Sequence, residues 1–165
     1  MANYVIHAKT GHYNITGASF MSYGKRYREA AEVWSKSSDL QGKFDPILYQ
    51  LLCQSLELHL KSFIWLKEKK SSTQIKSKYG HNIIKLWTHA KVRGINNYAR
   101  ITPLRDAVIT LVGPYYKEKK FCYLDIEMVF GGFSNLNAQP RAINTLFRLT
   151  QQLETSLRTP ILRAS

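Results

Sequence analysis

One long apolar helix in the middle of the chain constrains the fold more than any other feature. Asp45 and Pro46 are typical of a helix start, an N-cap residue followed by proline in the first turn. Leucines and aromatic residues then recur at three- and four-residue spacing as far as about Lys69. Further apolar residues widen this stripe around most of the circumference. Because a helix that is apolar on most sides is usually buried, the sequence predicts a central helix packed against several neighbours.

Shorter patterns predict further helices before and after the central one. Residues 18–37 carry aromatic and small residues at helical spacing. A third helix follows His81 and ends at Gly94, with cations in its last turn. Thr102 and Pro103 repeat the cap-then-proline start for a fourth helix, and Pro140 opens a last one.

Polar runs and prolines predict where these helices are interrupted. Ser71 to Lys78 is polar and basic and is predicted to be a loop. Proline removes a backbone donor and clashes with the preceding turn, so Gly113–Pro114 is expected to kink or end the fourth helix, and Pro160 to stop the last.

These elements predict an all-α fold, an up-and-down antiparallel bundle of four to five helices. A chain of 165 residues is expected to be a single domain, here residues 1–165. Residues 1–16 read as an irregular N-terminal arm. Residues 121–130 alternate apolar and polar side chains, and residues 121–133 are therefore predicted to form an extended aromatic arm before the last helix.

The net charge of +13 is the unusual feature of the composition. Twenty-four Lys and Arg residues face eleven Asp and Glu residues, which favours a polyanionic partner, nucleic acid above all, although solubility alone is the simpler explanation. The chain has no run of about 18 apolar residues and no apolar signal-peptide core near its start, so we expect a cytoplasmic protein without a membrane partner. No metal-ligand spacing, glycine-rich phosphate loop or dinucleotide fingerprint is present, so no metal or cofactor is expected.

Two lysine-rich segments are the candidate nucleic-acid contacts. The first follows the central helix and the second follows the fourth helix; their candidate residues are Lys69, Lys70, Lys76, Lys78, Lys85, Lys117, Lys119 and Lys120. Tyr79 and Trp87 beside the first segment, and several aromatic residues within the second, are candidates for stacking on single-stranded bases. The alternative for the first segment is a solvated loop.

Three residues are the candidates for chemistry. Glu57 and Lys61 stand four residues apart on one helix face, which indicates either a surface ion pair or a pair that faces a cleft. His81 at the start of the third helix could cap it, contact Glu57 or touch a phosphate. A structural hydrogen bond is the simpler role for His81, because no second histidine or cysteine lies at ligand spacing.

Two short motifs resemble those of the HEPN superfamily of small helical proteins. SLELHLKSFIWLK, residues 55–67, is similar to the family's helix with the pattern A-x-E-L-x-L-K-A-L-L, which Glu57, Leu58, Leu60 and Lys61 match. GHNIIKLW, residues 80–87, resembles the family's G-H-D-L-x-x-L, with Asn82 where Asp is frequent. The resemblance implies a helical bundle, often a homodimer or the companion of a nucleotidyltransferase, in toxin–antitoxin or phage-defence systems.

The ribonucleases of that family resemble one another in an Arg followed, after four to six residues, by a His. None of His59, His81 and His89 has an Arg at that spacing, and the fourth helix contains no His after Arg105. We therefore expect an RNA- or nucleotide-binding protein without the usual ribonuclease motif. The alternatives are a ribonuclease with a rearranged site at Glu57, Lys61 and His81, or a non-enzymatic interaction protein that docks a partner through its aromatic arm.

Overall fold

A computed structural model describes residues 15–37, 44–123 and 140–165, and the secondary structure of these residues is entirely helical. The all-α prediction is therefore confirmed. The helices are α1 (Gly17–Ser37), α2 (Pro46–Glu68), α3 (Ser72–Tyr79), α4 (Ile83–Val92), a short 3-10 helix (Ile95–Asn97), α5 (Pro103–Lys117) and α7 (Pro140–Ala164).

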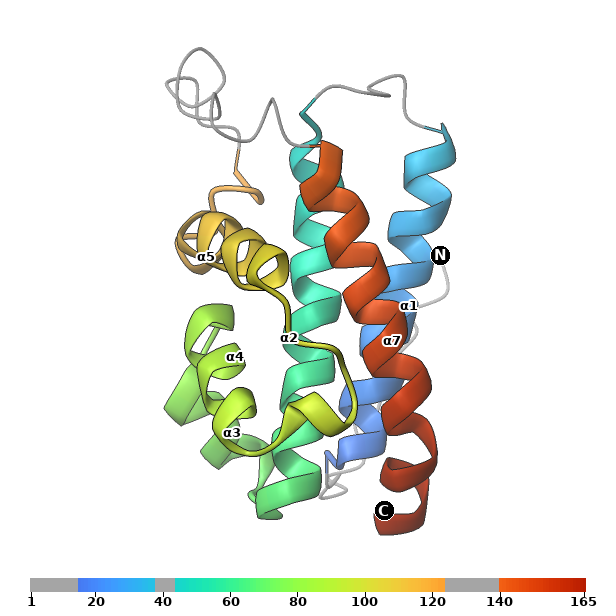
Figure 1. Cartoon of the computed structure of the whole chain (residues 1–165), viewed down its shortest axis with the longest axis vertical. Coiled ribbons are helices and arrows are strands. Elements are labelled where there is room, and N and C mark those ends of the chain that lie inside the picture. The colour runs from blue at the N-terminus through green and yellow to red at the C-terminus, as the bar shows by residue number, and fades with distance from the viewer. Residues whose placement is uncertain (1–14, 38–43, 124–139) are drawn as a thin grey trace, which may run out of the picture.

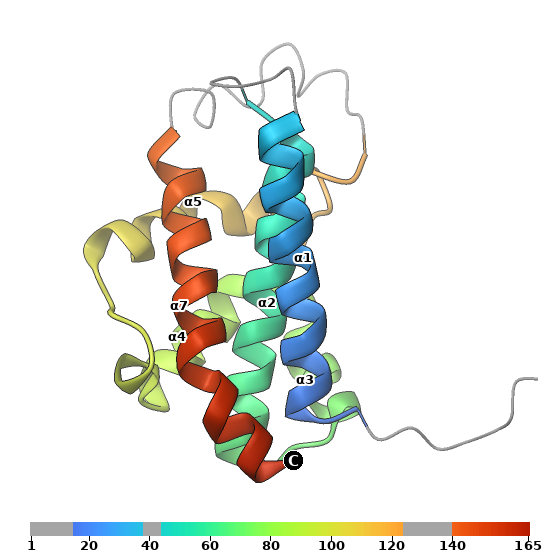
Figure 2. The ribbon, with the colours of Figure 1, turned by 90° about the vertical axis from the view of Figure 1, so that its right-hand side faces the viewer.

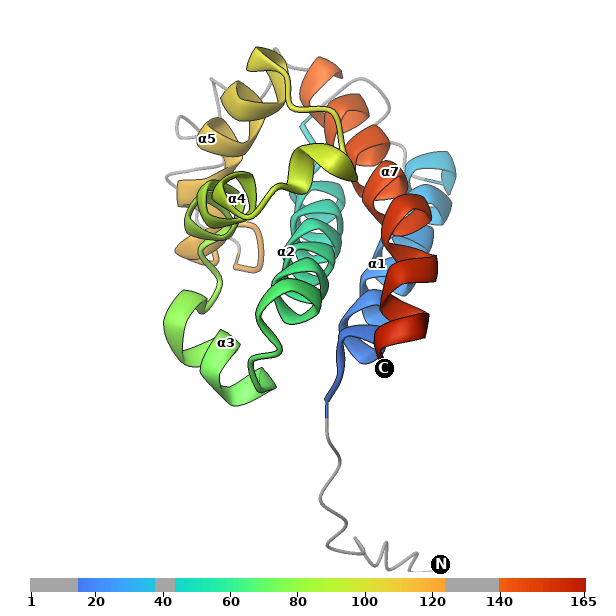
Figure 3. The ribbon, with the colours of Figure 1, turned by 60° about the horizontal axis from the view of Figure 1, so that its bottom comes forward.

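The three long helices α1, α2 and α7 lie side by side along the long axis of the molecule (Figures 1 and 2). Helix α1 runs opposite to α2 and α7, which share one direction. Helices α3, α4 and α5 lie on the other side of α2, and α5 crosses from α7 toward α4 (Figures 1 and 3). Helix α2 packs against α1, α7, α4, α5 and α3, so every layer of the bundle meets at this helix.

Helix α2 is the buried centre that the sequence predicts. Its side chains from Leu48 to Ile64 are mostly inaccessible, and Leu52, Leu56, Leu60 and Phe63 have no exposed surface. Five polar residues of the same helix, Ser55, Glu57, His59, Lys61 and Ser62, are buried with them. A buried polar group costs free energy unless it is hydrogen-bonded, so these five residues mark where α2 needs specific partners.

The predicted capping residues start their helices as expected. The Asp45 carboxylate accepts from the Leu48 backbone N–H at 3.1 Å and also from the Trp34 indole N–H at 2.7 Å, which links the end of α1 to the start of α2. Thr102 caps α5 by accepting from the Arg105 N–H at 3.2 Å. These bonds satisfy backbone donors that the first turn of a helix leaves unpaired.

The predicted loop at Ser71–Lys78 is wrong, because residues 72–79 form α3. Ser71 and Gln74 make a capping box, in which each side chain accepts a hydrogen bond from the other's backbone N–H. Ile75 and Tyr79, four residues apart, are both buried. The box and this apolar pair hold a helix of only two turns against the body of the protein, despite its polar composition.

Two prolines lie inside their helices: Pro160 does not stop the last helix as predicted, and of the two outcomes predicted for Gly113–Pro114, a kink or an end, the structure contradicts the end. Helix α5 continues through Pro114 to Lys117, and α7 continues through Pro160 to Ala164. Leu157 and Ile161 are fully buried on either side of Pro160, so packing offsets the lost backbone hydrogen bond. Gly113 serves packing instead of a turn, because a Cβ atom there would lie 2.5 Å from the Ile84 side chain of α4.

Glycines allow α1 to approach α2 closely. A Cβ atom at Gly24 would lie 2.9 Å from the His59 ring, and one at Gly17 would lie 2.4 Å from the Trp65 ring. Two serines of α2 donate to the carbonyl oxygens of these glycines, Ser55 to Gly24 and Ser62 to Gly17, each at 2.8 Å. The contact between α1 and α2 thus depends on small residues and on side-chain bonds to the backbone.

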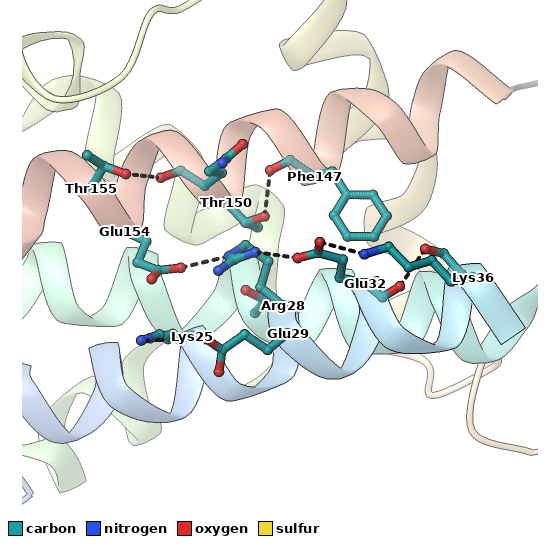
Figure 4. Close-up of polar contacts among 12 residues, drawn as sticks. Lys25, Arg28, Glu29, Glu32, Lys36, Phe147, Thr150, Glu154 and Thr155 are labelled. Atoms are coloured by element: carbon teal, nitrogen blue, oxygen red, sulfur yellow. Dashed lines mark hydrogen bonds and ion pairs between the residues drawn. The ribbon is translucent and has the colours of Figure 1, made fainter.

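A polar seam joins α1 to α7 (Figure 4). The Arg28 Nε donates to Glu154 of α7 at 2.7 Å, and the side chains of both residues are largely buried. Along α1, Glu32 pairs with Arg28 and Lys36 at i,i+4 spacing. Such surface pairs contribute only a few tenths of a kcal/mol each, so the largely buried bridge to Glu154 is the pair of this seam that adds most to the contact between α1 and α7.

The predicted N-terminal arm lies outside the described residues except at 15–16, and the predicted aromatic arm lies outside them beyond Tyr123. Its first residues, 121–123, form a turn. Phe121 is buried there and stacks on Tyr49 of α2, with ring centroids 5.5 Å apart. The beginning of the predicted arm is thus part of the core.

Candidate nucleic-acid interface

The three candidate residues for chemistry converge on one buried carboxylate. Glu57 is only 1% exposed. Its Oε1 accepts from Lys61 Nζ at 2.6 Å, and its Oε2 lies 3.0 Å from His81 Nδ1. Glu57 and Lys61 are therefore not the surface pair considered from the sequence, because Lys61 is also buried. The contact between His81 and Glu57 is confirmed, and the cap of α4 is Asn82 instead of His81.

Tyr116 of α5 completes this cluster, and the sequence gives no signal for it. The Tyr116 hydroxyl lies 2.7 Å from Glu57 Oε2 and 2.6 Å from the side-chain amide of Gln54. Burial and the nearby Glu57 carboxylate raise the pKa of the Tyr116 hydroxyl far above its usual value, so it stays protonated. The hydroxyl therefore acts as a donor, and its two nearest acceptors are Glu57 Oε2 and Gln54 Oε1.

The Glu57 cluster joins three parts of the chain that are distant in sequence. Glu57 and Lys61 come from α2, His81 from the turn between α3 and α4, and Tyr116 from the last turn of α5. The His81 and Tyr116 rings also meet edge to face, with centroids 6.1 Å apart. A buried carboxylate left without its partners costs several kcal/mol, so the cluster holds the end of α5 beside the α3–α4 turn.

His81 is the member of the cluster that reaches solvent. Its side chain is 50% exposed, and its Nε2 has no protein partner among the described residues. With Nδ1 turned toward Glu57, the imidazole presents Nε2 to the surface. The other described histidines differ, since His59 is fully buried in α2 and His89 binds Glu68.

Glu68 neutralises part of the first basic segment. Lys70 and Arg93 each lie within 2.7 Å of its carboxylate, and His89 binds the same group. Burial would raise the pKa of Glu68, but the bonds from Lys70, His89 and Arg93 outweigh it and hold that pKa at about 2. Lys70 is therefore engaged in an internal ion pair, unlike several other candidates.

The remaining candidates of the first segment are exposed cations. Lys69 Nζ lies 4.1 Å from the centre of the Trp65 ring and donates to the Ala164 carbonyl, so it links the end of α2 to the end of α7. Lys76, Lys78 and Lys85 are exposed on α3 and α4. Lys85 Nζ donates to the Lys78 carbonyl at 2.8 Å, and these three lysines have no acidic partner within the described part of the chain.

The second basic segment begins one residue after Tyr116. Lys117 and Lys119 are exposed, whereas Lys120 pairs with Glu118 at 2.9 Å. Because Tyr116 contacts both Glu57 and His81, the Glu57 cluster brings this segment next to the first. We call the exposed lysines that flank the contact between His81 and Tyr116 in sequence, Lys76, Lys78, Lys85, Lys117 and Lys119, the basic face.

Most of the predicted stacking aromatics are unavailable. Tyr79 and Trp87 are 3% and 2% exposed, and Trp87 donates its indole N–H to Asp106 at 2.6 Å. Tyr116 and Phe121 are buried as well. Tyr123, 69% exposed, is the ring of the second segment that the described structure leaves open for a base.

Comparison of the chain with protein-family models, with curated proteins and with solved structures finds no match. The resemblance to HEPN proteins therefore stays a prediction. None of the helices within the described ranges has the length and apolar character required to span a bilayer. Over the same ranges, no three His, Cys, Asp or Glu side chains are grouped as a metal site would require.

Proposed function

We propose that the basic face binds RNA, with single strands preferred over duplex. The observation that supports this function is the juxtaposition of two lysine-rich segments, about forty residues apart in sequence, around the exposed His81. Five exposed lysines, with Glu118 as the acidic residue between two of them, attract a chain of phosphates. The nearby Tyr123 offers one ring for stacking, so phosphate contacts carry most of the affinity.

Salt dependence tests this proposal because phosphate contacts release counterions. If the five lysines each neutralise one phosphate, log K falls with log salt at a slope of about −3.5 for a single strand. Affinity for a short unstructured RNA then drops about 100-fold between 50 and 200 mM salt. An affinity that is absent at 50 mM salt, or that salt does not change, contradicts the proposal.

A second function, RNA cleavage, is favoured by one observation, the pairing of Glu57 with the half-exposed His81. A carboxylate bonded to one ring nitrogen fixes the other as an acceptor, the arrangement of a general base. Replacing His81 with Asn keeps a polar partner for Glu57 and removes the base. Cleavage of RNA by the wild type and loss of at least about 100-fold in the variant supports this function; equal rates, or none, remove it.

The two HEPN-like motifs extend the proposal to the cellular setting. We propose a role in a toxin–antitoxin or phage-defence system, as a homodimer or with a nucleotidyltransferase subunit. Sedimentation of the purified chain tests the homodimer: a monomer at micromolar concentration speaks against it.

A further inference from the structure

The outer face of α3 carries a shallow pocket that is distinct from the Glu57 cluster. Its volume is about 430 Å³, and its lining residues are Lys70, Thr73, Gln74, Ser77 and Lys78. Four of the five stand on α3, the helix that the sequence did not predict, and Lys70 lies just before it. The lining contains two ammonium groups, two hydroxyls and one amide, and no carboxylate.

Several side chains of this pocket carry hydrogen-bond donors that are not used within the described part of the chain. The Gln74 side-chain oxygen accepts from the Ser71 N–H at 3.0 Å, which leaves the amide NH₂ as the free end of this side chain. Thr73 and Ser77 are exposed, and neither hydroxyl has a partner in the described ranges. Lys70 binds Glu68 through one contact at 2.6 Å and retains further ammonium protons. The pocket therefore suits a ligand rich in acceptors.

Both the charge and the size of the pocket favour a phosphate monoester on a nucleotide. A monoester carries about −1.5 to −2 charges at pH 7 and three terminal oxygens, whereas a backbone diester carries one charge and two such oxygens. The pocket is shallow and open to solvent, and its volume near 430 Å³ leaves room for more than a bare phosphate. The aliphatic stems of Lys70 and Lys78 and the Thr73 methyl supply apolar wall for the rest of a nucleotide.

We propose that this pocket binds the phosphate monoester of a nucleotide, either free or at the end of an RNA strand. The RNA-end form rests on the proposed RNA binding, because Lys78 belongs to both the pocket and the basic face. A strand held along the basic face then ends with its terminal phosphate on α3. Free mononucleotides would reach the same donors without any strand.

The test compares one short RNA sequence with hydroxyl ends, with a 5′-phosphate and with a 3′-phosphate, and adds AMP as a free mononucleotide. Binding is measured by fluorescence anisotropy with an internal label and, for AMP, by calorimetry. We expect one phosphorylated end, or AMP, to bind about tenfold more tightly than its unphosphorylated counterpart, adenosine in the case of AMP.

The variant pair Thr73→Val and Ser77→Ala, made together, removes two donors without changing charge or the capping box. It should abolish the preference for phosphate and leave the affinity for hydroxyl-ended RNA unchanged. Thr88→Val, at an exposed threonine of α4, is the matched control and should keep the preference. Thermal unfolding of each variant shows that the fold is retained.

The outcomes separate this proposal from the function on which its RNA form rests. Equal binding of all three RNA ends together with no preference for AMP over adenosine overturns the pocket, while steep salt dependence of hydroxyl-ended RNA still supports the basic face. A preference that survives in the Thr73→Val, Ser77→Ala variant also overturns the pocket. AMP binding that this variant abolishes supports the pocket even if RNA with hydroxyl ends does not bind.

Discussion

Acidification should destabilise this fold through His59, which is fully buried between α1 and α2. Its Nδ1 lies 2.8 Å from the Ser55 carbonyl oxygen, and its Nε2 is buried without a partner among the described residues. The Gly24 backbone packs directly against the ring. This burial lowers the pKa of His59 to about 4, since a charged imidazole there would lose its hydration.

The size of the effect follows from the difference between the folded and unfolded pKa. In the unfolded chain, His59 takes up a proton below about pH 6.5, whereas in the folded protein it stays neutral down to about pH 4. The unfolded state therefore binds more protons in this window, and stability falls as the pH falls. The full loss is about 3 kcal/mol, of which about 2 kcal/mol comes between pH 7 and pH 5.

Urea unfolding of the wild type and of His59→Gln at pH 7, 6 and 5 measures this loss. Glutamine keeps a donor for the Ser55 carbonyl but cannot titrate, so the other groups contribute equally to both proteins. We expect the free energy of unfolding of the wild type to fall by about 2 kcal/mol more than that of the variant. Parallel curves for the two proteins would refute the reasoning, since they would mean that His59 is protonated equally in both states.

Three further changes have definite expected outcomes. Gly24→Ala should lower the free energy of unfolding by about 1–3 kcal/mol in thermal melts, although alanine normally favours a helix, because its methyl has no room against α2; an unchanged or higher melting temperature would show that α1 can shift. Lys61→Met should lower the free energy of unfolding, measured with urea, by about 3–5 kcal/mol, because it leaves the buried Glu57 carboxylate without its cation. Adding Glu57→Gln should recover most of this loss; additive losses would contradict the reasoning. Ellman's reagent should react with Cys122 in the native protein and with Cys53 only after unfolding, because burial raises the pKa of the Cys53 thiol and shields it; two thiols reactive in the native state would place Cys53 wrongly.

The central helix and most helix starts could be predicted because local signals decide them. Asp45 with Pro46 and Thr102 with Pro103 act on their own first turns, and the apolar pattern of α2 reflects burial on most sides. The sequence does not predict α3 because most of its residues are polar. The capping box of Ser71 and Gln74 was the signal that could have revealed it.

At Pro160 and at several aromatic residues, tertiary packing overrides local preference. Buried side chains on both sides of Pro160 hold α7 together, which no local pattern shows. Tyr79 and Trp87 look available for bases beside lysines in the sequence, yet the fold buries both. A stacking ring can be identified only after the core is known, since the same residue types build cores and bind bases.

The candidate site was predictable only in part. The spacing of Glu57 and Lys61 gave their pairing, and the contact of His81 with Glu57 was one of the alternatives considered for it. Tyr116 lies 59 residues after Glu57, and nothing in its own segment indicates that its hydroxyl would reach the buried carboxylate. Long-range placement of this kind depends on how α5 crosses α2, which is a property of the whole bundle.

The most direct test of the account asks whether the two lysine-rich segments act as one surface. Salt titrations of single-stranded RNA binding are compared for Lys85→Gln, Lys117→Gln and the double variant, with Lys25→Gln on α1 as the control. The account predicts that each of the two single changes on the basic face reduces the salt slope by about 0.7, the double variant by about 1.4, and the control by nothing. A slope that responds to one segment alone, or to Lys25 as strongly as to Lys85 and Lys117, would contradict it.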